Sequence, residues 1–134
     1  MVLETKALTA GFGSEILNVD LARLNDSLID TILDALAEHA LLLFRRQSLD
    51  DAELATLAKA LGPVGIASKR SCLAPGHPEV MYVSNVQDGT GRVIGGLTQA
   101  DHSESIWHSD QSFREQPATL STLFCVHPPP VGGG

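Results

Sequence analysis

The sequence predicts an α+β domain, with helices in its first half and short strands in its second. Two amphipathic segments, with apolar residues every three or four positions, predict helices before residue 62. After residue 64, glycine, proline, serine and asparagine divide the chain into short apolar segments. A length of 134 residues and a hydrophobic fraction of 43% suit one globular domain with a single core.

The first elements follow from local patterns. The apolar residues in 16–21, after the turn Gly11–Gly13, predict a short strand. The next segment begins with Asn25–Ser27, whose side chains can accept hydrogen bonds from the first amides of a helix. Apolar residues then recur at helical spacing, so we expect a helix over 28–39.

A strand and a second helix complete the first half. The apolar run Leu41–Phe44 has the length of a fully buried strand. The residues Ser48–Asp51 resemble a capping box, and an apolar stripe follows them. Gly62–Pro63 would stop this second helix.

The second half predicts strands and loops. Apolar segments at Val80–Val83 and Leu120–Val126 have the composition of strands. The glycine-rich stretch Asp88–Ser105 has no periodicity and is expected to be a long loop. The chain closes on the turn-forming residues Pro128–Gly134, which suggests that a continuation has been lost.

Charge and composition argue against several classes of protein. The net charge of −7 argues against a protein that binds nucleic acids or an anionic membrane surface, because such a protein requires a basic face. No apolar run approaches the ~20 residues of a membrane-spanning helix, and the first residues lack an export signal. Cys72 and Cys125 match no metal or redox spacing. We therefore expect a cytoplasmic protein with free thiols, Cys125 being part of the core.

The sequence Trp107-His108-Ser109-Asp110 is the sharpest chemical feature. In an extended segment, residues two apart point to the same face, so His108 and Asp110 would lie side by side. An imidazole and a carboxylate together can bind a divalent ion, and one further histidine would complete the facial triad of non-haem Fe(II) oxygenases. The alternative is a solvated pair, because a chance His-x-Asp is common in a chain with five histidines.

Several further segments stand in a characteristic order around this motif. They are Leu41–Phe44 followed by Arg45-Arg46-Gln47, then Leu61-Gly62-Pro63, Trp107–Phe113, Pro117-Ala118 and Pro129–Gly133. Together they resemble the Fe(II)- and α-ketoglutarate-dependent oxygenases of the taurine dioxygenase and chlorophenoxyacetate dioxygenase (TauD/TfdA) family. The resemblance runs from about Gly11 to Gly134 and corresponds to the N-terminal part of such an enzyme.

The resemblance implies a double-stranded β-helix, or jelly roll, with helices packed outside it. In this interpretation residues 1–134 are the N-terminal part of a single TauD/TfdA-like domain, incomplete because the C-terminal half is absent. A jelly roll without half of its strands has open sheet edges and a half-built core. We therefore expect this fragment to fold poorly by itself.

The resemblance also implies a metal site and a reaction. His108 and Asp110 match the first two iron ligands, with α-ketoglutarate as co-substrate and dioxygen and a small anionic molecule as partners. The activity would be hydroxylation with release of succinate and CO2. The family's distal histidine and the arginine that holds α-ketoglutarate have no match before Gly134. The co-substrate residues are therefore unknown, and we expect the fragment alone to be inactive.

Three residues are candidates for substrate binding. Asn85 corresponds to a strand-end asparagine of the family, and Arg92 lies in the loop expected to cover the cavity. Phe113 would form a wall of that cavity, whereas Trp107 is expected to pack as core. Each has a simpler alternative, since asparagine also forms turns and a loop arginine is commonly only solvated. Lys69 and Arg70 are two further cations that could bind an anionic substrate or could simply be solvated loop charges.

Two other functions stay open at this stage. One is a non-catalytic truncated relative that folds poorly or acts only in association with another chain. The other is a metal-independent, β-rich binding module with His108 and Asp110 on its surface. The sequence also leaves a homo-oligomer open.

Overall fold

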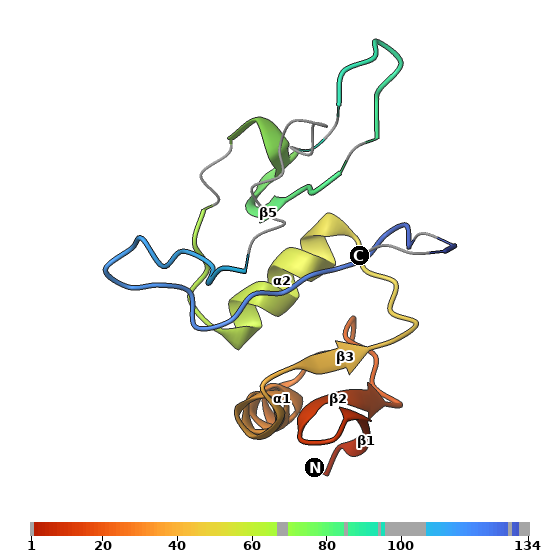
Figure 1. The fold of residues 1–134 in the computed structure, drawn as a ribbon, viewed down its shortest axis with the longest axis vertical. Helices are drawn as coiled ribbons and strands as arrows, with labels where there is room; N and C mark the ends of the chain where they lie inside the picture. The colour runs from red at the N-terminus through yellow and green to blue at the C-terminus, as the bar shows by residue number, and fades with distance from the viewer. Residues whose placement is uncertain are drawn as a thin grey trace. The chain divides into compact units, whose positions relative to one another are not determined.

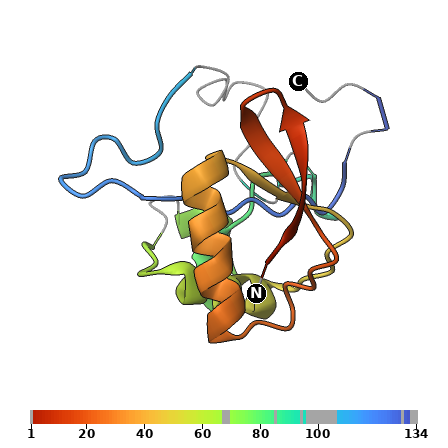
Figure 2. The same ribbon diagram turned by 90° about the horizontal axis from the view of Figure 1, so that it is seen from below.

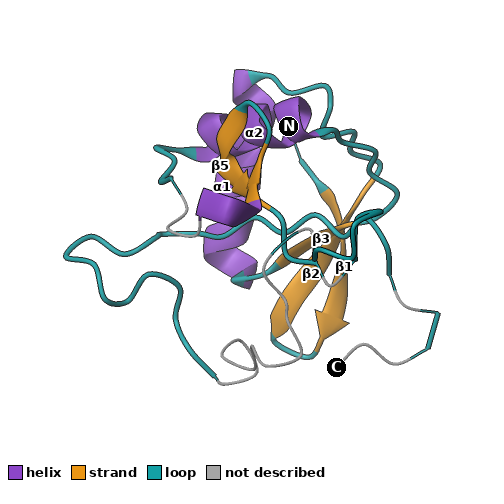
Figure 3. Ribbon diagram, turned by 90° about the horizontal axis from the view of Figure 1, so that it is seen from above, coloured by secondary structure: helices purple, strands orange, loops and turns teal. Residues whose placement is uncertain are grey.

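The computed structural model describes residues 2–66, 70–84, 86–93, 95, 107–128 and 130–131. The chain divides into two compact units, Met1–Val64 and Gly65–Gly134, and each is described by itself. Their helices and strands are coloured along the chain in Figure 1 and by type in Figure 3. The described elements confirm the mixed α+β class.

A three-stranded sheet is the basis of the first unit. The strands β1 (Glu4–Thr9) and β2 (Phe12–Leu17) form an antiparallel hairpin. The strand β3 (Leu42–Phe44) joins the other edge of β2 in parallel, with Ser14 opposite Leu42. The helix α1 (Asp26–His39) connects β2 to β3 and lies beside them, as Figures 1 and 2 show.

The helix α1 confirms the predicted helix over 28–39 and its capping group. The Asn25 side chain accepts a hydrogen bond of 3.0 Å from the Leu28 amide. At the other end, Ala40 adopts a left-handed backbone conformation, and its N–H donates to Leu36 O at 2.8 Å. Each end of the helix therefore has a local capping hydrogen bond.

The helix α2 (Asp51–Leu61) confirms the second predicted helix and corrects its start. The capping box is formed by Asp50 and Glu53, not by Ser48–Asp51 as predicted. The Glu53 amide donates to Asp50 Oδ1 at 2.8 Å, and the Asp50 amide donates to Glu53 Oε2 at 2.9 Å. The helix ends before Gly62, as the sequence predicts.

The core of the first unit joins both helices to the chain that follows β2. Its buried members are Leu21, Leu28, Ile32 and Leu57, with partly buried residues such as Leu42 and Phe44 packed around them. The strand β3 is half-buried and not fully buried as predicted. The reason is its position at an edge of the described sheet.

The described part of the second unit has little regular structure. A short 3₁₀ helix η1 (Arg70–Cys72) leads into a two-stranded hairpin of β4 (Leu73–Ala74) and β5 (His77–Met81). The strand predicted at Val80–Val83 is therefore found slightly earlier. The strand predicted at Leu120–Val126 is wrong for the described chain, which has no regular structure there. None of the described strands pairs with that segment, so within the described residues it has no ladder partner.

Two further predictions change in this unit. Cys125 is exposed and not part of a core. The loop predicted over Asp88–Ser105 begins with a tight turn, closed by a bridge between Gln87 and Val93, while residues 96–105 lie outside the described part. In the described residues no helix has the length and apolar character needed to cross a membrane.

Candidate metal centre

His108 and Asp110 lie next to each other in the second unit. His108 Nε2 is 3.3 Å from Asp110 Oδ1. Both side chains are about half exposed, at 51% and 53%. The imidazole and the carboxylate therefore face each other at a place that is partly open to solvent.

The pair lies at the start of a turn and outside the strands of the described chain. No strand is assigned over residues 107–113, and a turn begins at Asp110. Gln111 has a φ of 54°, in the left-handed region, and the Arg114 amide donates to Gln111 O at 2.9 Å. The two side chains lie next to each other, as predicted, in a segment that is not part of a strand in the described residues.

The geometry suits two adjacent ligands of one divalent ion. Nitrogen and oxygen ligands lie about 2.1 Å from such an ion, so two of them about 90° apart are about 3 Å from each other. The measured 3.3 Å is close to that value. An imidazole nitrogen with one carboxylate oxygen also has the chemistry of the Fe(II) facial triad. The donor pair therefore fits two of the three protein positions.

The third position is not supplied within the described residues. There, no group of three or more histidine, cysteine, aspartate or glutamate side chains is placed to hold an ion. His127, the one histidine after the motif, lies exposed in an irregular segment before the proline run. Within the described residues, His108 and Asp110 are therefore the only two candidate ligands that lie together at this place.

Ser121 is a neighbour of this site that sequence reasoning missed. Its Oγ donates to Asp110 Oδ2 at 2.5 Å. A serine eleven residues after an aspartate belongs to no local pattern, so no signal in the sequence could have identified it. The contact depends on how two irregular segments lie in space.

The aromatic residues flanking the motif are not buried. Trp107 is fully exposed, so the prediction that it packs as core is wrong in this structure. Phe113 is 80% exposed, with the Arg114 guanidinium 6.0 Å from its ring centroid. Its proposed place in a cavity wall stays a prediction. Asn85 and Lys69 lie outside the described residues, and Arg70 is exposed at the start of η1.

Arg92 lies in the tight turn that follows β5. Asp88 organises this turn, because its Oδ1 accepts hydrogen bonds from Thr90 N at 2.8 Å, Thr90 Oγ1 at 2.6 Å and Arg92 N at 3.0 Å. The Asp88 amide in turn donates to Arg92 O at 2.8 Å. The Arg92 side chain therefore stands on an ordered, exposed hairpin turn. Its role toward a substrate stays a prediction.

The same hydrogen bonds make this turn sensitive to pH. The Thr90 hydroxyl, then the Thr90 and Arg92 amides, lower the pKa of Asp88 below its usual value. Because the folded pKa is lower than the unfolded one, the carboxylate stabilises the turn above the unfolded pKa, and this contribution is lost as the pH falls through the folded pKa. We expect the Thr90 and Arg92 amide signals in NMR to titrate with a midpoint below that of an unstructured aspartate. Asp88→Asn should abolish this transition, and a midpoint at the ordinary value would contradict the prediction.

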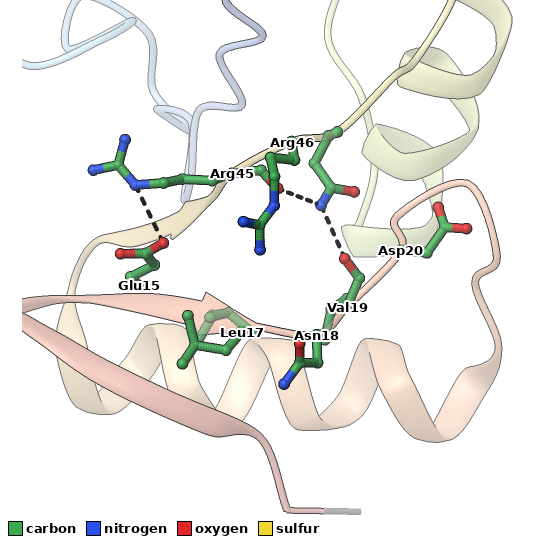
Figure 4. Close-up of a pocket in the computed structure, with 9 residues that line it drawn as sticks. Glu15, Leu17, Asn18, Val19, Asp20, Arg45 and Arg46 are labelled. Atoms are coloured by element: carbon green, nitrogen blue, oxygen red, sulfur yellow. Dashed lines mark hydrogen bonds and ion pairs between the residues drawn. The ribbon is translucent and has the colours of Figure 1, made fainter.

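A separate polar pocket of about 250 Å³ lies in the first unit, at the carboxyl ends of β2 and β3 (Figure 4). There, the Gln47 side chain links the segments that follow β2 and β3. Its Nε2 donates to Val19 O at 2.9 Å and to Arg45 O at 3.0 Å, and its Oε1 accepts from the Leu21 amide at 2.9 Å. Arg45 also pairs with Glu15, with Nε and Oε1 3.2 Å apart. These contacts give this polar region a structural role.

Comparison with known proteins gives a consistent result. The family model described as "Taurine catabolism dioxygenase TauD, TfdA family" matches residues 4–134. Pentalenolactone F synthase of Streptomyces avermitilis is 29% identical over 132 residues, which cover 97% of this chain and 42% of that protein. An alkylsulfatase of Acinetobacter baylyi is 31% identical over 134 residues, which cover 98% of this chain and 38% of that protein.

A solved structure gives the same picture. A taurine dioxygenase from Burkholderia xenovorans matches with a TM-score of 0.58 and 29% sequence identity, over 64% of this chain and 31% of that chain. The chain thus spans about two-fifths of the length of the curated relatives it matches.

Proposed function

Because this chain belongs to the TauD, TfdA family of dioxygenases, we propose that it forms part of an Fe(II)- and α-ketoglutarate-dependent oxygenase. The observation that carries this proposal is the convergence of His108 Nε2 and Asp110 Oδ1, 3.3 Å apart. A histidine nitrogen and a carboxylate oxygen in this arrangement are two of the three ligands in the facial triad of such oxygenases.

We assign each residue of the pair a defined task. His108 would bind the metal through Nε2 as a neutral imidazole, and Asp110 would bind it through one oxygen of an ionised carboxylate. Protonation of either group would remove a ligand, so metal affinity should fall on acidification. The chemistry that Fe(II) and α-ketoglutarate supply when bound is the dioxygen-driven hydroxylation of a substrate, with succinate and CO2 released.

In a full-length member of the family, the part that this chain does not cover would complete the site. We propose that the third ligand and the residue that holds α-ketoglutarate belong to that part, and that the complete domain is a jelly roll. The 134-residue chain alone should then form no succinate. A cytoplasmic location is part of the same proposal.

The substrate proposed is a small anionic molecule. Two relatives are named for substrates that carry an anionic group, the sulfonate of taurine in one case and the sulfate of alkyl sulfates in the other. On this chain, Arg92 on its exposed turn is the cation proposed to orient such a group, with Asn85 and Phe113 as further candidates. A charge-assisted hydrogen bond from a guanidinium orients a carboxylate or sulfonate well.

Mn(II) is a suitable probe for the pair, because it is paramagnetic and reports weak binding by broadening NMR signals. We expect Mn(II) to broaden the amide signals of residues 107–111 in the wild-type chain. His108→Ala and Asp110→Ala should each remove most of this effect. His127→Ala is the matched control, since this exposed histidine lies outside the pair.

The outcome separates the proposal from its main alternative. Broadening that is equal in the wild type and in His108→Ala would contradict the metal role. It would favour a metal-independent binding module. In a polypeptide of the family's full length, succinate formation with sulfonates, sulfates and carboxylates would then identify the substrate class.

A further inference from the structure

The two oxygens of Asp110 have different neighbours. Oδ1 faces His108 Nε2 at 3.3 Å, whereas Oδ2 accepts a hydrogen bond from Ser121 Oγ at 2.5 Å. An ionised carboxylate only accepts, so the serine hydroxyl must be the donor. A hydrogen bond from a hydroxyl to an ionised carboxylate is charge-assisted and stronger than one between neutral groups.

This bond restricts the rotation of the Asp110 carboxylate. The torsion that turns a carboxylate about its Cβ–Cγ bond has broad minima, so it is weakly fixed by itself. Asp110 is also about half exposed, so packing does not fix it. The contact with Ser121 selects the rotation in which Oδ1 faces the imidazole.

From this geometry we propose that Ser121 is a positioning residue for Asp110, an inference that rests on the metal site proposed above. The hydroxyl holds Oδ2, so that Asp110 would present one oxygen to the ion. One-oxygen ligation leaves more coordination positions free than two-oxygen ligation does. Hydrogen-bond partners of this kind orient the ligands of a metal, and their loss typically lowers metal affinity by about 10-fold or more.

The contact also has a structural consequence. Ser121 lies in the irregular, mostly exposed segment 117–126, eleven residues after Asp110 in the chain. The bond therefore ties this segment to the site.

A pair of variants of equal shape tests the role of the hydroxyl. Ser121→Thr keeps the donor, whereas Ser121→Val has the same branched shape and lacks it. The measurement is the Mn(II) concentration that half-broadens the amide signals of residues 107–111 in the 134-residue chain. We expect Ser121→Thr to stay close to the wild type and Ser121→Val to require about 10-fold more Mn(II).

Four further variants make the result specific. Thr122→Ala removes the hydroxyl next in the chain, which is exposed, and should leave the Mn(II) midpoint unchanged. Ser121→Ala gives the same comparison if the valine side chain is not accommodated. His108→Ala and Asp110→Ala report on the metal site itself.

The possible failures can be told apart. If His108→Ala and Asp110→Ala bind Mn(II) as the wild type does, the proposed function fails. If those two variants lose binding while Ser121→Thr and Ser121→Val have equal midpoints, only the role of Ser121 is overturned.

Discussion

Ile32→Ala is expected to lower the free energy of unfolding of the first unit by about 3 kcal/mol. Ile32 lies on α1, is 3% exposed, and belongs to the buried cluster with Leu21, Leu28 and Leu57. Truncation to alanine removes apolar atoms from this cluster and leaves a cavity that its neighbours fill only in part. The loss is large compared with the usual stability of a small domain.

Far-UV circular dichroism during urea unfolding measures this effect, because α1 and α2 both lie in the first unit. Asp34→Ala is the matched control, since Asp34 is exposed on the same helix. Its unfolding free energy should stay within about 0.5 kcal/mol of the wild type. A loss below about 1 kcal/mol for Ile32→Ala would contradict the core assigned to this unit.

The elements that the sequence predicts well are those that depend on local interactions. The helices α1 and α2 are specified by capping side chains at Asn25 and Asp50 and by apolar residues at helical spacing. These signals lie within a few residues of each other, so they can be identified without knowledge of the tertiary structure.

Strands are less predictable because their partners are distant in the chain. The strand β1 was missed, since its residues Glu4–Thr9 are mostly exposed and show no apolar alternation. It forms because its backbone pairs with β2. The segment Leu120–Val126 has the composition of a strand, yet the described chain offers it no strand partner.

The same difference between local contacts and contacts distant in the chain applies to the candidate site. Its two candidate ligands, His108 and Asp110, are close in sequence, and their contact could be predicted from residue type and spacing. The left-handed conformation of Gln111, in the turn that follows them, could not, because that conformation is uncommon for residues other than glycine. The contact with Ser121 depends on tertiary structure alone.

Gln47→Leu is expected to lower the free energy of unfolding of the first unit by about 2 kcal/mol. The Gln47 side chain makes three hydrogen bonds that join the exit of β2 to the exit of β3. Leucine has a similar volume and no polar atoms, so it leaves the amide of the buried residue Leu21 and the carbonyl of Val19 without these partners. A buried donor without an acceptor bears the full cost of its desolvation.

Urea unfolding of Gln47→Leu gives the size of this effect, and hydrogen exchange of the Leu21 amide locates it. We expect that amide to exchange faster in the variant, since its hydrogen bond to Gln47 Oε1 is lost. Ser48→Ala is the neighbouring control at an exposed position and should change the stability by less than about 0.5 kcal/mol. If the Leu21 amide exchanges at the same rate in the variant and in the wild type, other contacts protect it from exchange. That result would contradict the role of Gln47 in linking the segments that follow β2 and β3.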